Sequence, residues 1–163
     1  MTADPAKSGF RFEKRRADAV VRLAGGDAVK GCFFVAGSAT HDGTERVAEL
    51  LNSEAGFFPF EIEGTGGAHT VLYHRAHVVL AQVFDDEARR DPGYAVAPSL
   101  DVSLLLTTGD RISGAIRVYQ PAGHSRLSDW TRQRETFRYL ETEGATLIVN
   151  AAHIVAVTEV SRS

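Results

Sequence analysis

Three histidines and an arginine lie close together in the segment HTVLYHRAHVV, where their spacing could support chemistry. His74 and His77 flank Arg75, and His69 precedes them. If two strands meet at a corner around Arg75, the two imidazoles could approach each other and hold a metal or an anion. In one continuous strand they would instead point to opposite faces, because side chains alternate.

A similar corner stands near the end of the chain, in the segment TLIVNAAHIV. Asn150 replaces His74 there, and His153 stands where His77 stands in the first segment. Without a complete ligand set, a structural role is favoured for the two shared histidines. If the corners do bind a ligand, we expect contacts from His74, Arg75 and His77 at the first and from Asn150 and His153 at the second.

Other short motifs are incomplete versions of catalytic or phosphate-binding sites. The segment GHSRL, which contains Ser125, lacks the final glycine of a Gly-x-Ser-x-Gly nucleophile elbow. The glycine loop at residues 64–67 lacks the Lys-Ser/Thr pair of a phosphate-binding loop. Because no full set of nucleophile, base and orienting group is visible, we predict a protein that is not an enzyme and needs no metal ion and no cofactor.

Two arginines near the start of the chain indicate an alternative function, the binding of a phosphate-containing ligand. Arg11 and Arg15 form an Arg-x-x-x-Arg pattern ahead of a β-rich region, and such arginines can grip phosphates in bidentate fashion. The pattern resembles the start of domains that bind cyclic dinucleotides. Those domains also carry an Asp/Asn-x-Ser-x-x-Gly run, which this sequence lacks, so this reading ranks below the others.

The segments that would position these residues form an internal repeat, so that each occurs twice in the chain. Three pairs of segments match in order, and their spacings differ by only a few residues, as loops of different length would produce. The pairs are residues 24–35 with 107–118, 46–60 with 126–140, and 70–79 with 146–155.

Within each copy the pattern predicts a small set of short strands. A Gly-Asp turn joins the first two, and Gly31 and Gly114 fall inside the second strand, where glycine marks a bend or bulge. A helical turn follows in each copy. At its start in the second copy, Arg126 and Asp129 could form an ion pair on one helical face. Pro59 predicts an edge or a bulge in the next strand.

Domain boundaries follow from the repeat and from a charged, proline-containing linker. The acids of that linker, Asp85, Asp86 and Glu87, are expected to be solvated. The predicted parts are a basic segment at residues 1–16, a first repeat at 17–84, the linker at 85–99 and a second repeat at 100–163.

The closing segments of both copies carry a family resemblance. VNAAHIV, an apolar strand with a short polar corner and an Ile-Val strand, resembles the second motif of the Sm-like fold, and LYHRAHVV is similar to the corner of the bacterial Sm-type RNA chaperone. RLSDW with a later Phe in the second copy, and Leu51 with Asn52 in the first, look like an uncharacterised bacterial family of Sm-like domains. The resemblance implies a mainly β protein of two tandem, bent Sm-like barrels with about five strands each.

Composition and resemblance together set the functional expectation. The chain has 163 residues, a net charge of −3, one cysteine and no apolar run long enough to span a membrane. Cys32 is expected to be a small buried residue in a cytoplasmic protein. The resemblance implies self-association through edge strands into a homo-oligomer and RNA binding at the two corners. A scaffold that recruits a protein partner is the alternative.

Overall fold

The computed structural model describes residues 14–37, 45–64, 66–67, 69–119 and 127–160, and within them the chain is mainly β, as predicted. The first half, residues 14–83, and the second half, residues 99–159, contain the same order of elements. Those of the first half are β1 (Lys14–Leu23), β2 (Ala28–Ala36), α2 (Val47–Asn52), β3 (Phe57–Ile62), β4 (His69–His74), η1 (Arg75–His77) and β5 (Val78–Val83).

The second half follows a linker that contains the short 3₁₀ helix η2 (Glu87–Arg90). Its elements are β6 (Ser99–Leu106), β7 (Arg111–Arg117), α3 (Leu127–Thr131), β8 (Phe137–Thr142), β9 (Ala145–Asn150), η3 (Ala151–His153) and β10 (Ile154–Glu159). No helix in the described ranges is long and apolar enough to cross a membrane.

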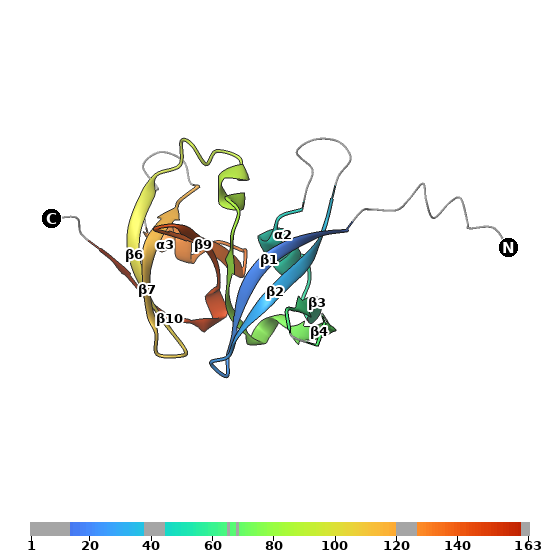
Figure 1. Ribbon diagram of the computed structural model, residues 1–163. Coiled ribbons are helices and arrows are strands. Elements are labelled where there is room, and N and C mark those ends of the chain that lie inside the picture. Colours follow the sequence, from blue (N-terminus) through green and yellow to red (C-terminus); the bar gives the residue numbers. More distant parts are fainter. Residues whose placement is uncertain (1–13, 38–44, 65, 68, 120–126, 161–163) are drawn as a thin grey trace.

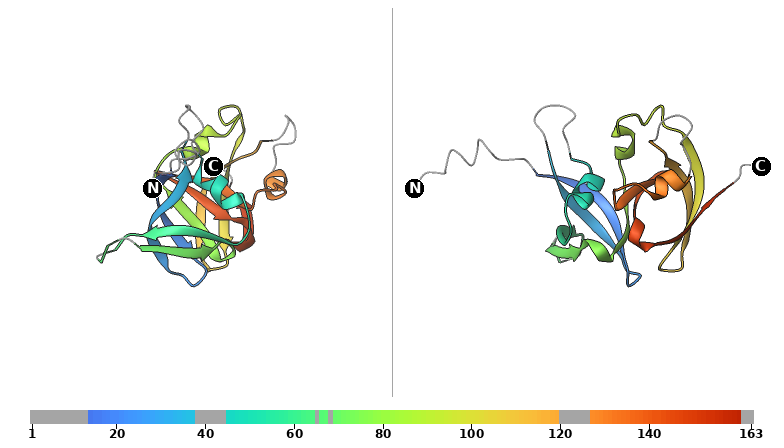
Figure 2. Two further views of the ribbon diagram at one scale, coloured as in Figure 1. Left: turned by 90° about the vertical axis from the view of Figure 1, so that its right-hand side faces the viewer. Right: turned by 180° about the vertical axis from the view of Figure 1, so that it is seen from behind.

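All ten described strands belong to one antiparallel sheet, in the order β10-β6-β7-β8-β9-β5-β1-β2-β3-β4. The two halves join where β5 pairs with β9, with Leu80 opposite Val149 and Val83 opposite Thr146. Figure 1 shows the blue and green strands of the first half beside the yellow and red strands of the second, and Figure 2 shows the same arrangement from the side and from behind. Two separate barrels are not confirmed, because the sheet is continuous across the junction and open at β10 and β4.

Glycines make the tight hairpins and close strand contacts that the sequence predicts. Gly26 and Gly109 adopt φ values of 97° and 89° in the turns that follow β1 and β6, a conformation that glycine adopts without strain. A Cβ atom on Gly31 would lie 2.0 Å from the carbonyl oxygen of Glu61, and one on Gly114 would lie 2.6 Å from that of Glu141. Only glycine allows the neighbouring strand to approach this closely.

Pro59 lies in a strand that is paired on both sides for only part of its length. β3 pairs with β4 from Phe57 to Ile62, but its pairing with β2 covers only the residues from Phe60 onward. Pro59 therefore falls where β3 is free on its β2 side, so its missing N–H removes no bond from that ladder. β3 as a whole is an internal strand between β2 and β4, and only its first residues, which include Pro59, have an unpaired edge as predicted.

Two hydrophobic cores fill the concave faces of the sheet, and each takes residues from both halves. The core of the first half, around Phe33, also contains Phe137 and Ile148 from the second half. The core of the second half, around Trp130, also contains Val79 and Leu80 from β5. Cys32 is buried, as predicted.

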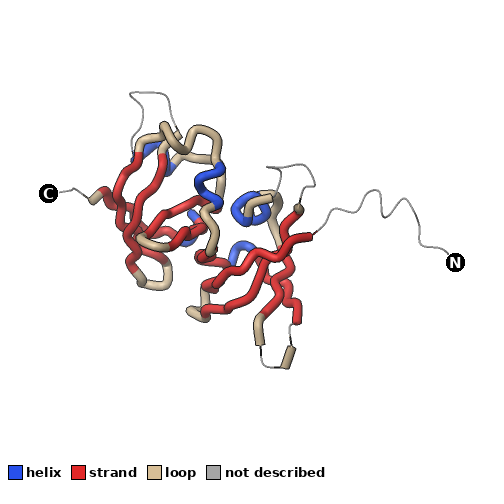
Figure 3. The backbone as a smooth tube through the Cα atoms, turned by 45° about the horizontal axis from the view of Figure 1, so that its top comes forward, coloured by secondary structure: helices blue, strands red, loops and turns tan. Residues whose placement is uncertain are grey.

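At the start of helix α2, Glu49 accepts two hydrogen bonds from Arg46. The backbone N–H of Arg46 donates to Oε1 of Glu49 at 3.2 Å, and Nε of Arg46 donates to the same oxygen at 2.8 Å. Arg46 and Glu49 also form an ion pair. The ion pair predicted for the second copy involves Arg126, which lies outside the described residues. Figure 3 shows the short helices packed among the strands and near the junction of the halves.

Candidate functional site

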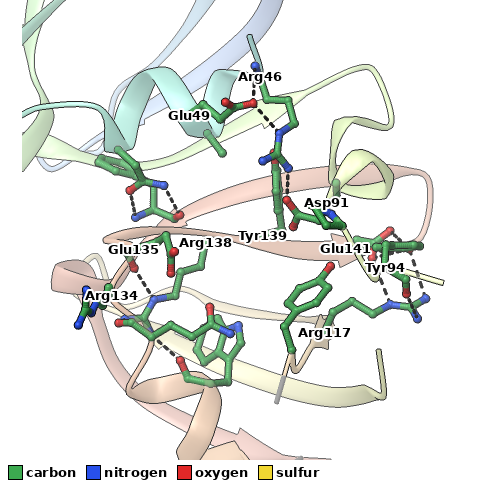
Figure 4. Close-up of a pocket in the computed structure, with 18 of the residues that line it drawn as sticks. Arg46, Glu49, Asp91, Tyr94, Arg117, Arg134, Glu135, Arg138, Tyr139 and Glu141 are labelled. Atoms are coloured by element: carbon green, nitrogen blue, oxygen red, sulfur yellow. Dashed lines mark hydrogen bonds and ion pairs between the residues drawn. The ribbon is translucent and has the colours of Figure 1, made fainter. Parts of the chain in front are cut away.

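A cavity of about 680 Å³ lies where the two halves and the linker meet. Its walls come from α2, the linker, β7, α3 and β8, so it exists only because the halves pack against each other (Figure 4). The volume falls in the range of roughly 300–1,000 Å³ that is usual for small-molecule sites. The charged and aromatic side chains that line it are Arg46, Glu49, Asp91, Tyr94, Arg117, Tyr119, Trp130, Arg132, Arg134, Glu135, Phe137, Arg138, Tyr139 and Glu141.

One wall of the cavity is built around Arg46. Its guanidinium pairs with Glu49 and also with Asp91 of the linker, and it lies 5.9 Å from the centre of the Tyr139 ring. Burial acts to raise the pKa of Glu49, but the hydrogen bonds from Arg46 outweigh it and hold that pKa below its usual value. This network fixes the linker against the first half.

Arg117 fixes the linker against the second half. Its guanidinium stacks 4.1 Å from the centre of the Tyr94 ring and donates to the carbonyl of Ala97 at 3.1 Å. The hydroxyl of Tyr94 donates to Glu141 at 2.7 Å, and burial, together with this carboxylate, raises the pKa of the tyrosine. Nε of Arg117 is buried, has no hydrogen bond to any of the residues that the structure describes, and lies 3.9 Å from Glu141.

Arg138 closes the end of α3 from within the cavity wall. Its guanidinium donates to the carbonyls of Trp130 at 2.9 Å and Gln133 at 2.7 Å, and Nε donates to the carbonyl of Glu135 at 2.7 Å. It also lies 5.2 Å from the centre of the Trp130 ring. The last carbonyls of the helix are thereby satisfied by a side chain.

The buried carboxylate of Glu87 lies behind the cavity. It accepts from the backbone N–H groups of Val47 at 3.0 Å and Ala48 at 3.1 Å, and from the hydroxyl of Tyr139 at 2.6 Å. Burial raises the pKa of Glu87 despite these bonds. Glu87 is only 1% exposed, so the expectation of a solvated linker acid was wrong for this residue.

The five residues predicted from the sequence lie elsewhere, at the two corners η1 and η3. Arg75 is 4% exposed, and its guanidinium donates to the carbonyls of Leu50, Leu51 and Phe57. It therefore caps the end of α2 and is turned away from solvent. Nδ1 of His74 accepts from the N–H of Ala76 at 3.1 Å and so caps η1.

The second corner packs directly on the first. Asn150 is buried, accepts from the N–H of Ala152 at 2.9 Å and donates to the carbonyl of Val78 at 2.9 Å. Nε2 of His153 lies 2.7 Å from the carbonyl oxygen of Ala76, and its Nδ1 lies 2.7 Å from the hydroxyl of Thr107. These contacts are structural and join the halves.

Among the five predicted corner residues, His77 is the one that is exposed. Its ring centre lies 5.6 Å from that of His74. The structure therefore shows the corner that was expected to bring the two imidazoles together, and not the continuous strand that would separate them. Ligand binding at the corners remains a prediction. Of the two arginines in the Arg-x-x-x-Arg pattern, Arg11 lies outside the described residues and Arg15 is an exposed residue of β1.

The cavity was not predicted from the sequence. Its linker residues, Asp91 and Tyr94, are separated from Arg46 and Arg117 by long stretches of chain. The local signal that could have pointed to it is the arginine-rich run after Trp130, which the repeat places at the end of a helix. Comparison with known proteins adds no guide here, since no family model, no curated protein and no solved structure matches the chain.

Proposed function

We propose that this protein is a non-enzymatic assembly module in which each half is an Sm-like unit and the open sheet edges pair between chains. The strand order β5-β1-β2-β3-β4 in the first half and β10-β6-β7-β8-β9 in the second are equivalent, which supports a common unit. The inner edges of these units already pair as β5 with β9. The outer edges are β4, which is the equivalent of β9, and β10, which is the equivalent of β5.

One observation carries this proposal. Phe57 and Leu72 are 59% and 63% exposed. The residues at the same positions of the corresponding strands in the second half, Phe137 and Ile148, are buried in the core of the first half. Exposed large apolar groups at an unpaired edge are a common mark of an interaction surface.

The opposite edge shows the same relationship. Val155 of β10 is 61% exposed, whereas Val79, which holds the same position in β5, is buried in the core of the second half. Pairing β10 of one chain with β4 of the next would bury Val155, Leu72 and Phe57 as their counterparts are buried. Such a head-to-tail contact generates a ring or a filament.

The β5–β9 pairing supplies the register for this contact. Transferred by strand position, it places four residue pairs opposite one another between chains. They are Ala156 with Tyr73, Val157 with Leu72, Thr158 with Val71, and Glu159 with Thr70.

Sedimentation velocity on the full chain tests the proposal. The expected result is a species larger than the 17.6 kDa monomer, reduced to the monomer by Leu72→Glu. Val96→Glu is the matched control, because Val96 is 85% exposed in the linker, away from both edges. A wild-type chain that stays monomeric at about 100 μM would contradict the proposal and would favour a scaffold that pairs with another protein.

A further inference from the structure

The cavity at the junction of the halves has two arginine side chains at one end that form no ion pair with the described residues. Arg132 and Arg134 follow α3 directly and are exposed. Within the described part of the chain neither side chain has a hydrogen bond or an ion pair, in contrast to Arg46, Arg117 and Arg138. Figure 4 shows Arg134 at the opposite side of the cavity from Arg117. Positive charge at this end is therefore free to meet an anion.

The fold itself does not require arginines at this place. In the first half, the segment that follows α2 reads Ser-Glu-Ala-Gly over residues 53–56 and has no basic residue. The helix end there is satisfied by Arg75, as the end of α3 is satisfied by Arg138. Arg132 and Arg134 contribute to neither cap, so these contacts do not require their charge.

The middle of the cavity offers aromatic surface. Tyr119 is 39% exposed and lines the cavity, whereas Trp130, which also lines it, is only 2% exposed and belongs to the core. Aromatic faces stack on nucleobases, and arginine pairs bind phosphate in bidentate fashion. Asp91 and Glu141 at the far end can accept further bonds from amino or hydroxyl groups, because each carboxylate has more than two lone-pair positions.

We propose that this cavity binds a nucleoside phosphate, with the phosphate on Arg132 and Arg134 and the base stacked on Tyr119. Glu135 also lines this end, where its backbone carbonyl accepts from Nε of Arg138 and its carboxylate acts electrostatically on that guanidinium. Within the described residues it forms no ion pair with Arg132 or Arg134. All the lining residues belong to one chain, so binding does not depend on pairing of the sheet edges.

Trp130 provides a direct signal for the test, because it is the only tryptophan in the chain and forms part of the cavity wall. The full-length protein is titrated with adenosine 5′-monophosphate while its tryptophan emission is recorded, with correction for absorption by the nucleotide. Adenosine and inorganic phosphate are titrated separately. We expect a saturable change with AMP at a Kd below about 1 mM, and at least roughly tenfold weaker binding of adenosine or phosphate alone.

Two double variants distinguish AMP binding in this cavity from nonspecific attraction to positive charge elsewhere on the protein. Arg132→Gln with Arg134→Gln should weaken AMP binding by about tenfold or more. Arg89→Gln with Arg111→Gln removes two exposed arginines outside this cavity and should leave binding unchanged. Equal binding by both doubles, or no saturable change up to about 10 mM AMP, would overturn the proposal. Sedimentation of the same samples reports the assembly state independently.

The source of the nucleotide is resolved by a further titration with a single-stranded hexanucleotide of adenosine. Tighter binding than AMP that is lost in the Arg132→Gln, Arg134→Gln variant would identify the ligand as a unit of single-stranded RNA. Equal or weaker binding would identify a free nucleotide. Both results keep the site, whereas hexanucleotide binding that is unaffected by the double variant, without AMP binding, would refute it.

Discussion

The hydroxyl of Tyr139 donates a 2.6 Å hydrogen bond to the buried carboxylate of Glu87. Tyr139 belongs to β8 of the second half and Glu87 to the linker, while the same carboxylate accepts from the N–H groups of Val47 and Ala48 at the start of α2. One side chain therefore connects the first half, the linker and the second half. Its loss would leave three buried donors without a partner.

Glu87→Ala should lower the free energy of unfolding by about 2–4 kcal/mol, because unsatisfied buried donors are costly. Urea denaturation followed by circular dichroism measures the change. Asp86→Ala is the matched control, since the neighbouring Asp86 is exposed and makes no capping bond, and it should change stability by less than about 0.5 kcal/mol. Equal effects of the two variants would argue against the role given to Glu87.

The contribution of Glu87 should also depend on pH. Burial raises the pKa of Glu87 in the folded chain above the value of about 4.3 of an unfolded glutamate. Between these two values the folded state binds more protons, so its stability falls as pH rises through the folded pKa. The free energy of unfolding of the wild type, relative to that of Glu87→Gln, should be higher at pH 4 than at pH 7. A difference that is constant or rises with pH would contradict this.

Arg75→Ala should destabilise the protein by about 2–4 kcal/mol, because the carbonyls of Leu50, Leu51 and Phe57 would lose a charged donor in a buried place. Thermal or urea unfolding measures this effect. Arg89→Ala, at an exposed linker position, is the control and should be almost neutral. A fully stable Arg75→Ala variant would show that the buried cap is dispensable.

Gly31→Ala should destabilise the sheet, because the added Cβ would lie 2.0 Å from the carbonyl oxygen of Glu61 and force β2 and β3 apart. A loss of about 2–4 kcal/mol is expected from such overpacking. Gly25→Ala serves as the control, since a Cβ there meets nothing within 4 Å and its φ is not in the left-handed region. Chemical denaturation of the two variants side by side gives the comparison.

The register of the proposed edge pairing can be tested by cross-linking. In a Cys32→Ala background, Val157→Cys combined with Leu72→Cys should give disulfide-linked species larger than the monomer under mild oxidation, because opposed residues meet the short Cα separation that a disulfide needs. Val157→Cys with His69→Cys shifts one partner along β4 and should cross-link poorly. Non-reducing electrophoresis records the result, and equal yields would contradict the register.

Much of the fold could be predicted from local signals. The Gly-Asp turns, the strand glycines Gly31 and Gly114, and the corners at Arg75 and Asn150 fall within short stretches whose chemistry depends on immediate neighbours. The joining of β5 to β9 was not visible, because strand pairing between distant segments leaves no periodic signal in either one. The sequence therefore indicated small β units but not the continuous sheet.

The candidate site was less predictable than the fold. Arg75 was expected among the ligand-contacting residues of the first corner, but its guanidinium is buried and donates to the last carbonyls of α2. Glu87 was expected to be solvated and proves to be buried, because the linker folds back over the start of α2. In both cases a polar residue has its partners on another element, which tertiary packing alone determines.

The sharing of core residues across the junction has a consequence for folding kinetics. β5 lies between β1 of its own half and β9 of the other, and Val79 and Ile148 are buried in the core of the opposite half. Neither half can lose its structure without exposing apolar surface in the other, so unfolding should be a single cooperative transition. Because β1 must find β5, and β5 must find β9, across many intervening residues, the high contact order predicts slow folding on the scale of milliseconds to seconds.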